Sequence, residues 1–531
     1  MSREHQLLAA SVVKEVNRIP AARLVYLDGA PAQSDFPLSN KATFSPGSEV
    51  EILAGPSDKP VSIFKGVVVA QSLKVRERKA PELVIECRHK AVKLTVGRKN
   101  ACFLAQPDSD IISHLLESAG LDADVESTAV THPQQVQFRA SDWDFLLTRA
   151  EANGKLVLAG SDKVAVKAPA FGGAAVATLL FGATILELDA HVDARLQWSA
   201  VKGATWDPAQ QALVEREAVD PGVSGPGNFK SDDLAGVVGL PAYQLRHASI
   251  TEDEAQAWAD AEWLKSRMSK VSGRVKCEGI AAVNPGDIIT LSGVGDRYGG
   301  NVFVTGVRHD NDPGHGWKTN VQFGSVERWS ADERAVAAPR AGALLPPTSG
   351  LQIGVVTSNE DSEGEHRVRV RLPLVDDSDG VWARVASLDA GSDRGFFFRP
   401  EIGDEVIVGF LDDDPRCAVI LGMLHSSAKA APLQGSDDNH EKVFQSRSKM
   451  RLYFNDDKKV MRLETPGGNK LTLSDEDKGI KIEDQNGNTI ELNADGIHIA
   501  SKKALKIEGK TEAELSSSAT TSIKGLKIKL N

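Results

Sequence analysis

The stretch that decides the fold is residues 450–500, MRLYFNDDKKVMRLETPGGNKLTLSDEDKGIKIEDQNGNTIELNADGIHIA. It consists of apolar couplets whose two members stand two positions apart, so both lie on one face of a β-strand. Turn formers such as Asn486-Gly487-Asn488 separate the couplets, which recur every seven to ten residues along most of the tail. The couplets are Leu452/Phe454, Met461/Leu463, Leu471/Leu473, Ile480/Ile482, Ile490/Leu492, Ile497/Ile499, Leu505/Ile507, and Ile523 with Leu526/Ile528/Leu530.

This period is too short for a solenoid made by one chain. A single-chain coil closes around its own core and needs repeats of about 20–45 residues. Three chains can close such a coil together if each contributes one face. We therefore predict that residues 442–531 form one third of an intertwined trimeric β-helix, a needle of about nine steps and roughly 40 Å or more. The alternative is a run of hairpins in an ordinary sheet.

The overall composition excludes several classes of protein. At 531 residues the chain is too long for one core, so about three to five domains are expected. The net charge of −11 disfavours nucleic acid as a partner, because a nucleic-acid binder needs a basic face. The four cysteines lack CxxC spacing and predict neither a zinc site nor a disulfide framework. We expect no signal peptide and no membrane-spanning segment.

The first part of the chain alternates between strand-like and helix-like segments. Residues 1–100 and 161–335 carry short apolar runs between Gly, Pro and Asp turns, which predicts β-barrels or sandwiches. Residues 101–160 mix helices and strands and predict an α/β subdomain. An Ala/Pro-rich linker follows at 336–349, and residues 350–425 have the pattern of five short strands, as in an OB-fold. A polar linker at 426–441 leads into the needle.

Three helices have start signals in the sequence, and two of them also have stop signals. Asp108 is a plausible N-cap for a helix that stops at Gly120, and Ser141 begins a second helix that ends at Gly154. Thr251 begins a third, with Glu254 completing a capping box. The apolar stripe predicted for this third helix is Ala257, Ala261, Leu264 and Met268.

Four stretches of the sequence resemble the VgrG spike proteins and related phage-tail hubs. FRASDWDFLLTRAEANGKLVLA (138–159) and GVRHDNDPGHGWKTNVQFG (306–324) are similar to segments of the family's hub. VRVRLP (368–373) and WARVASLDAGSDRGFFFRPEIGDEVIVGFLDDDPRCAVILGMLH (382–425) resemble its OB-fold. The tail resembles its trimeric β-helix. The resemblance implies a mainly β protein with a first hub β-barrel at 1–100, an α/β hub subdomain at 101–160 and a second hub β-barrel at 161–335.

The resemblance also implies a function and partners. A VgrG-like spike is a non-enzymatic homotrimer at the tip of a contractile injection machine, where it joins a hexameric inner tube and baseplate proteins to a threefold needle. The needle would cross the target-cell membrane transiently. Its blunt tip would seat a PAAR-type tip protein through Leu526, Ile528, Lys529, Leu530 and Asn531. No catalytic, cofactor-binding or metal site is expected, and residues 426–441 leave no room for the lysozyme domain that a phage spike inserts there.

The owner of the spike and its location are further expectations. Because the chain stops at the needle, we expect an extracellular, phage-tail-like particle, assembled in the bacterial cytoplasm, rather than a type VI secretion spike. A tailed-phage baseplate hub is an alternative, and the neighbouring genes would distinguish it from the extracellular particle. A glycan-cleaving tailspike enzyme is a further alternative, but it needs a carboxylate pair on a broad solenoid face, and no such pair stands out.

Several motifs suggest ligand sites but fit turns better. His309, Asp310, Asp312 and His315 are metal-ligand residue types within a loop between strands. The acidic runs 412–414 and 475–479 are read as charged turns, because the spacing of a calcium loop is missing. The glycine-rich run 293–300 precedes a strand instead of a helix, which excludes a dinucleotide fingerprint. The run 222–225 misses the G-x-S-x-G elbow because Pro226 follows it.

Overall fold

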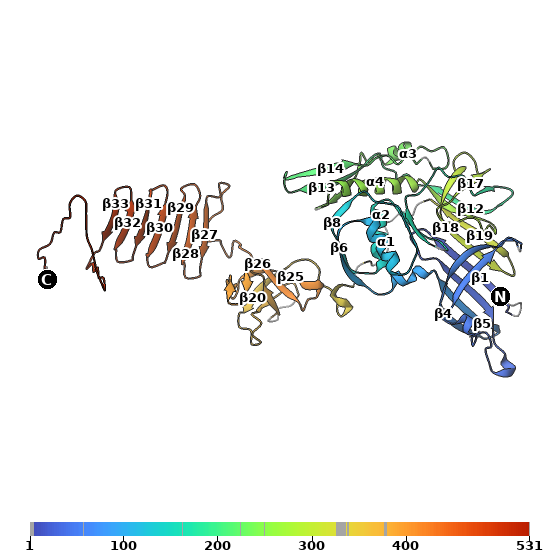
Figure 1. The fold of residues 1–531 in the computed structure, drawn as a ribbon, viewed down its shortest axis with the longest axis horizontal. Helices are drawn as coiled ribbons and strands as arrows, with labels where there is room; N and C mark the ends of the chain where they lie inside the picture. Colours follow the sequence, from blue (N-terminus) through green and yellow to red (C-terminus); the bar gives the residue numbers. More distant parts are fainter. Residues whose placement is uncertain are drawn as a thin grey trace. The chain divides into compact units, whose positions relative to one another are not determined.

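The computed structural model describes residues 5–56, 58–161, 163–223, 225–248, 250–324, 336, 339–375 and 380–529. The chain divides into two compact units, Met1–Pro339 and Arg340–Asn531. Strands dominate both units (Figure 1), which confirms the mainly β fold class. Among the described residues, no helix combines the length and the apolar character needed to cross a bilayer.

One sheet of eleven strands organises the first unit. Its main path is β12-β16-β19-β18-β1-β2-β5-β4-β3, while β11 pairs with β17 and β17 with β18. The bounds are β1 Leu7–Glu15, β2 Ala21–Leu27, β3 Glu49–Ala54, β4 Val61–Arg76, β5 Lys79–Arg88, β11 Ala177–Leu180, β12 Ile185–Val192, β16 Val271–Glu278, β17 Ile288–Ser292, β18 Gly300–Asp312 and β19 Gly316–Phe323.

The two predicted hub segments share this sheet. Strand β1 pairs with β2 on one side and with β18 on the other, so hydrogen bonds join residues 1–100 to residues 161–335. Each segment still has its own core, one around Tyr26 and Phe64 and the other around Val304 and Phe323. The hub therefore has two β cores joined through one strand pair.

The α/β part lies between these segments in sequence. Helices α1 (Asp108–Ser118) and α2 (Asp142–Ala152) share a core with small β elements. Strand β6 (Lys99–Pro107) pairs with β8 (Thr131–Ala140). A three-stranded sheet contains β7 (Ala123–Val125), β10 (Val164–Lys167) and β9 (Leu156–Ala159). As predicted, Ser141 caps α2 by accepting a hydrogen bond from the Asp144 backbone N–H.

Helix α4 (Glu252–Met268) packs against a separate sheet of β13 (Val201–Asp207), β14 (Ala212–Glu217) and β15 (Tyr243–His247). A shorter helix, α3, spans Ser231–Val238. Thr251 caps α4 as predicted, but the predicted apolar stripe is partly wrong, because Ala257 and Leu264 are only half-buried. The fully buried residues include Ala255, Ala259 and Trp263, since α4 contacts β13 on one side and α2 on another.

The first part of the second unit is a closed five-stranded barrel. The order is β20-β21-β22-β26-β25, and β20 also pairs with β25. The bounds are β20 Gln352–Ser358, β21 Val368–Arg371, β22 Val381–Val385, β25 Glu405–Phe410 and β26 Ala418–Met423, with a small hairpin of β23 (Ala390–Gly391) and β24 (Arg394–Gly395). Gly380 is required at φ 92°, because a Cβ there would lie 1.9 Å from the Val370 carbonyl oxygen. The predicted OB-type barrel is confirmed.

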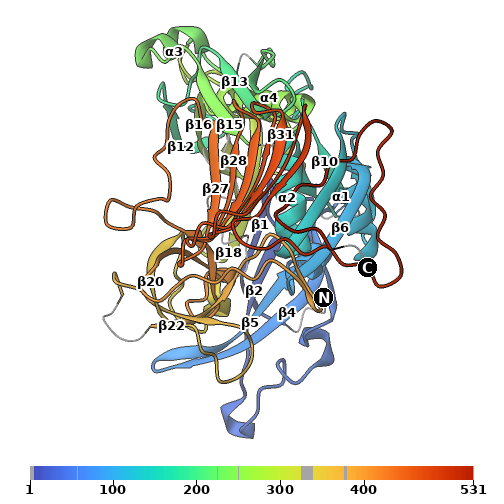
Figure 2. The same cartoon turned by 90° about the vertical axis from the view of Figure 1, so that its left-hand side faces the viewer.

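The second part is a seven-stranded antiparallel sheet whose strands follow one another in chain order (Figure 1), and Figure 2 shows its strands β27, β28 and β31 from another side. They are β27 Glu441–Gln445, β28 Arg451–Asn455, β29 Val460–Glu464, β30 Lys470–Ser474, β31 Gly479–Glu483, β32 Thr489–Asn493 and β33 Gly496–Ala500. Within one chain the tail is thus a single open layer.

The described residues after β33 contain no further strand. Steps were predicted at Leu505/Ile507 and from Ile523 to Leu530, but residues 501–529 have no regular secondary structure within one chain. Leu530 lies outside the described residues. A strand is stable only beside a hydrogen-bonding neighbour, and this single chain provides none there.

Candidate functional site

The seven-stranded sheet has one apolar face, because cross-strand pairing places all its couplets on the same side. Two rows of side chains cross the strands, with one residue from each strand in each row. The first row is Lys442, Phe454, Met461, Leu473, Ile480, Leu492 and Ile497, and the second is Phe444, Leu452, Leu463, Leu471, Ile482, Ile490 and Ile499. Lys442 is the one charged residue in either row.

The opposite face is polar and carries cross-strand ion pairs. Across neighbouring strands, Lys481 Nζ lies 3.2 Å from Glu491 and Arg451 lies 3.2 Å from Glu464, while Lys481 Nζ also lies 3.0 Å from Glu483 on its own strand. Such pairs keep neighbouring strands in register while their outer surface stays hydrated. The apolar face is therefore stabilised by exclusion of water, whereas the polar face is stable in contact with water.

The turns between strands are held by local hydrogen bonds. In the turn after β31, the Asp484 carboxylate accepts backbone N–H bonds from Asn488 at 2.8 Å and from Asn486 at 2.9 Å. These bonds, with those from the two asparagine amides, lower the pKa of Asp484 to about 2. Gly487 has a φ of 84°, a conformation that glycine adopts without strain.

The apolar face is uncovered within one chain. Ile480, Ile482 and Ile497 are 39%, 44% and 72% exposed. No residue of either row is buried, whereas the buried Val460 lies on the opposite face. Contiguous apolar surface of this kind marks an interaction site.

The apolar face continues onto a loop of the OB barrel. Phe398 lies with its ring centroid 6.2 Å from that of Phe396 and 6.2 Å from that of Phe444. These rings border an apolar cavity of about 900 Å³ that extends over Leu452 and Leu471. The sequence analysis missed this cluster, although three consecutive phenylalanines before Arg399-Pro400 could have indicated it.

The predicted tip-contact residues are not gathered into a site by the structure. Leu526, Ile528 and Lys529 are exposed in the segment without regular structure. Leu530 and Asn531 lie outside the described residues. Contact with a tip protein stays a prediction.

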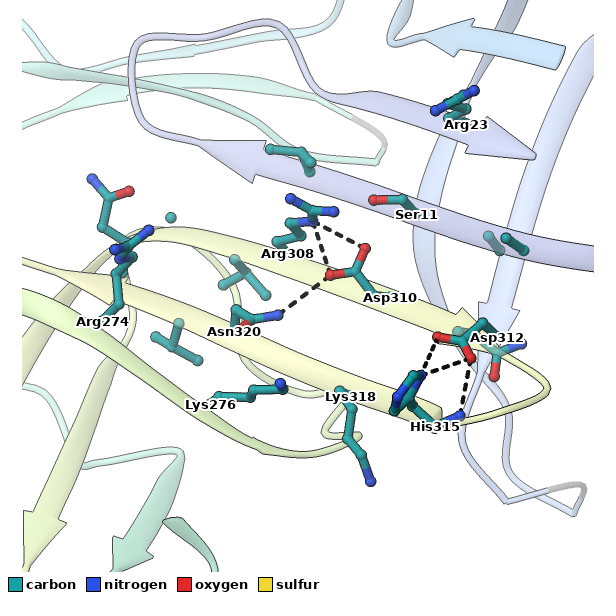
Figure 3. A pocket seen from close by; sticks show the side chains of 18 of the residues that line it. Ser11, Arg23, Arg274, Lys276, Arg308, Asp310, Asp312, His315, Lys318 and Asn320 are labelled. Atoms are coloured by element: carbon teal, nitrogen blue, oxygen red, sulfur yellow. Dashed lines mark hydrogen bonds and ion pairs between the residues drawn. The ribbon is translucent and has the colours of Figure 1, made fainter. Parts of the chain in front are cut away.

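The hub sheet carries a groove of about 780 Å³ over β1, β2, β16, β18 and β19 (Figure 3). Its basic lining residues are Arg23, Arg274, Lys276, Arg308 and Lys318. Lys276 is paired with Glu187 and Lys318 with Glu278, both at 2.7 Å. Arg308 lies 2.8 Å from Asp310. The groove is therefore largely charge-balanced.

The four residues of metal-ligand type, His309, Asp310, Asp312 and His315, do not converge, and the first three belong to strand β18 instead of a loop. Asp310 faces Arg308 and Asn320, while Asp312 faces His315 (Figure 3). His309 is buried on the other side of the strand, with Nδ1 3.1 Å from Thr319 Oγ1, and burial lowers its pKa to about 4. Within the described ranges, no group of three or more His, Cys, Asp or Glu side chains is placed to hold a metal ion.

The other motifs form turns or connections. Asp414 binds Arg416, and Asp477 accepts a hydrogen bond from Ser474 Oγ, so both acidic runs have structural partners. The glycine-rich run 293–300 connects β17 to β18. Ser224 of the run 222–225 lies outside the described residues.

A model described as the Alg8 N-terminal domain matches residues 1–312, more than half of the chain. The chain belongs to this family. In this Alg8-type protein, residues 352–425 match a type VI secretion system/phage-baseplate injector OB domain. Residues 460–531 match a phage baseplate V C-terminal trimerisation domain. The resemblance to VgrG-like spikes is thereby confirmed.

Curated relatives match only a part of the Alg8-type chain. It is 32% identical to the type VI secretion system spike protein VgrG5 of Pseudomonas aeruginosa over 129 residues, which are 21% of this chain and 16% of that protein. It is 32% identical to the actin cross-linking toxin VgrG1 of Vibrio cholerae over 120 residues, which are 21% of this chain and 11% of that protein. The chain thus spans less than a fifth of the length of either relative.

Solved structures share a weaker likeness with the Alg8-type chain. A 43 kDa prophage tail protein from Shewanella oneidensis aligns with a TM-score of 0.44 and 11% identity, over 60% of this chain and 94% of that one. An E. coli component of the type VI secretion system aligns with a TM-score of 0.40 and 13% identity, over 80% and 98%. Both scores lie below 0.5, so neither structure establishes the fold.

The sequence analysis also missed a buried charge network in the hub. Arg149 binds Asp108 through Nε at 2.7 Å and Glu254 through Nη2 at 3.1 Å. His132 Nε2 lies 3.0 Å from Asp108. Glu254 was expected to complete a capping box, but its carboxylate serves this network. The network ties together α1, β8, α2 and α4 and has a structural role.

Proposed function

We propose that this chain is the spike and hub of a contractile injection machine and that it works as a homotrimer without catalysis. The observation that carries the proposal is the uncovered apolar face of β27–β33. Three copies can turn these faces toward one axis and close a prism with the polar faces outward. The trimerisation-domain match of residues 460–531 supports this arrangement.

The energetics favour three chains over one. Complete burial of a Leu or Ile side chain contributes about 1.5–3 kcal/mol, and each copy brings two rows of such residues. Within each face of the prism, the strands from β28 to β32 have hydrogen-bonded neighbours on both sides, so none of them can be lost singly. A needle of this kind is stiff, as puncturing requires.

The hub and the tip have separate partners in this proposal. Residues 1–335 dock on the hexameric inner tube and the baseplate proteins, and the ring of joined barrels adapts threefold to sixfold symmetry. The end of the needle carries a PAAR-type tip protein and crosses the target-cell membrane when a separate sheath contracts. No cofactor takes part.

We further propose that the machine is an extracellular, phage-tail-like particle assembled in the bacterial cytoplasm. The relatives named above include a type VI secretion spike, so type VI secretion is the principal alternative, followed by a phage baseplate hub. The neighbouring genes would distinguish these three kinds of machine, according to whether they encode a sheath with or without a membrane-anchoring complex.

The first experiment measures the solution mass of the full-length chain by light scattering, beside a chain that ends at residue 440. We expect three times 56.9 kDa for the full chain. A monodisperse, folded monomer would overturn the proposal, since the apolar face would then have no cover. The shorter chain tells whether the hub trimerises alone.

Two point variants test the apolar face itself. Leu471→Lys places a charge on the apolar face of β30, and Thr472→Lys places the same charge on the polar face of the same strand. We expect Leu471→Lys to abolish the trimer and Thr472→Lys to leave it intact. Equal effects would contradict an interface made by this face.

A further inference from the structure

The connection between β22 and β25 carries three consecutive phenylalanines, whose side chains divide between two places. Phe396 and Phe398 border the cavity of about 900 Å³ over the apolar face of the tail sheet, and Phe397 does not. Phe397 lies beside barrel residues instead, with its ring centroid 5.9 Å from Arg399 Cζ and 6.4 Å from the ring centroid of His366. The first and third rings therefore belong to the cavity, and the second belongs to the barrel.

Hydrogen bonds hold this connection in place on the barrel. The Phe396 backbone N–H donates to the Asp389 carbonyl at 2.9 Å, and Ser387 Oγ donates to the Phe396 carbonyl at 2.8 Å. Arg394 Nη1 donates to the Asp389 carboxylate at 2.6 Å. The backbone thus presents the two rings in a fixed position, yet 47% of Phe396 and 65% of Phe398 stay exposed. Two exposed aromatic rings gain free energy when another apolar surface covers them.

The two rings extend only one row of the apolar face, at its β27 end, which we call the base. The second row begins at Phe444, whose ring centroid lies 6.2 Å from that of Phe398. The first row begins at Lys442, which is paired with Asp456 and gives that row a charged end. The apolar surface therefore passes from the sheet onto the barrel at the base of the second row and not at the base of the first.

Threefold symmetry decides what faces the two rings. When three copies turn their apolar faces toward one axis, the second row of each copy lies beside the first row of the next copy. The cavity lies over the second row, at Leu452, Leu463, Leu471 and Ile482. Because Phe396 and Phe398 border the same cavity, they face the neighbouring copy as well. Without these rings, the base of the prism would expose its apolar interior to water.

We propose that Phe396 and Phe398 form an interface between copies of this chain, where they close the base of the prism against the first row of a neighbouring copy. The inference rests on the trimer proposed above and extends its interface from the tail to the OB barrel. Three such pairs of rings make an apolar plug beneath the needle. The plug also fixes each barrel to the needle, because the rings belong to the barrel and pack on the tail sheet.

The test places the photoreactive analogue p-benzoylphenylalanine in the full-length chain at position 398 and, as a matched control, at position 397. We expect irradiation of the Phe398→p-benzoylphenylalanine variant to produce covalent oligomers on a denaturing gel. Mass spectrometry should find the cross-linked partner within residues 442–461 of another copy. The variant at Phe397 should remain monomeric on the same gel, because its ring lies beside the barrel.

A second pair of variants measures what the rings contribute to the assembly. Phe398→Ser should lower the melting temperature of the trimer by about 5 °C or more, because the loss of a buried phenylalanine ring is among the costliest changes in an apolar core. Phe397→Ser removes the same ring from the position outside the cavity and should leave the melting temperature near the native value.

The outcomes separate this inference from the proposed function. A native protein that is trimeric, but whose variant at position 398 gives only cross-links within one chain, would overturn the inference and leave the trimer standing. Equal melting temperatures of Phe398→Ser and Phe397→Ser would have the same meaning. A native protein that is monomeric by light scattering would overturn the proposed function, and this inference with it.

Discussion

In both the OB barrel and the seven-stranded tail sheet, inward and outward side chains alternate along the strands, but the barrel closes on itself and the tail sheet stays open. In the barrel, β20 pairs with both β21 and β25, so the sheet closes and Val368, Val370 and Val408 are fully buried. In the tail sheet, β27 and β33 are the two edges, and Ile480 and Ile482 stay partly exposed. One chain completes the first core and leaves the second open.

The difference lies in how the strands are connected. The barrel strands follow the order β20-β21-β22-β26-β25, with longer connections that let the first and last strands of the path meet. The tail strands are joined by short turns in strict succession, which produces a meander. One chain is therefore enough to bury the core of the barrel, whereas the apolar face of the tail is buried only when several chains assemble.

The largest expected effect is a charge in the barrel core. Ala383→Asp buries an unpaired carboxylate and should cost more than about 4 kcal/mol, enough to unfold the barrel at any protein concentration. The control is Arg384→Asp, on the exposed side of the same strand. Circular dichroism melting checks both variants. A barrel that tolerates Ala383→Asp would show that its closed core is not what stabilises it.

A smaller expected effect is a cavity in the tail. Leu473→Ala should cost about 2–5 kcal/mol per copy, but only in the trimer where the side chain is buried. Its melting temperature should therefore rise with protein concentration more steeply than that of the native chain. Thr472→Ala is the control on the polar face. If the melting temperatures of both variants did not depend on protein concentration, the idea that the tail needs an assembly would be contradicted.

Acid should weaken the tail through Asp484. Its pKa of about 2 in the folded chain lies below the value of about 3.9 in the unfolded chain. The stabilisation is thus complete above about pH 4 and is lost as the pH falls through about 2. Melting between pH 5 and 2 should show this loss, and Asp484→Asn should show less of it. Asp495→Asn, in the next turn, is the control.

The smallest expected effect is the loss of an outer ion pair. Lys481→Met removes the cation between Glu483 and Glu491, and exposed pairs contribute less than about 1 kcal/mol. The difference from the native protein should shrink in 1 M salt, which screens the charges. Melting at low and high salt measures it. A larger, salt-insensitive loss would mean that Lys481 is buried in the assembly.

Local signals were predictable from the sequence, and long-range contacts were not. The caps at Ser141 and Thr251 were predicted because a cap depends on residues three positions apart. The buried residues of α4 were partly mispredicted because two different elements cover that helix. The strands expected after β33 are absent because a strand needs a neighbour that one chain does not supply there.

Sequence alone determined the mainly β class, the turns, the helix caps at Ser141 and Thr251, and the segregation of apolar couplets to one side of the tail. All of these arise from residues within a few positions of each other. The N-cap predicted at Asp108 was wrong, because α1 begins at Asp108 after Pro107 and no side chain caps it. Only the tertiary structure decided that β1 joins the two hub cores and that the tail forms an open layer with one uncovered face. These features depend on which distant segments pack together, and residue spacing does not encode that choice.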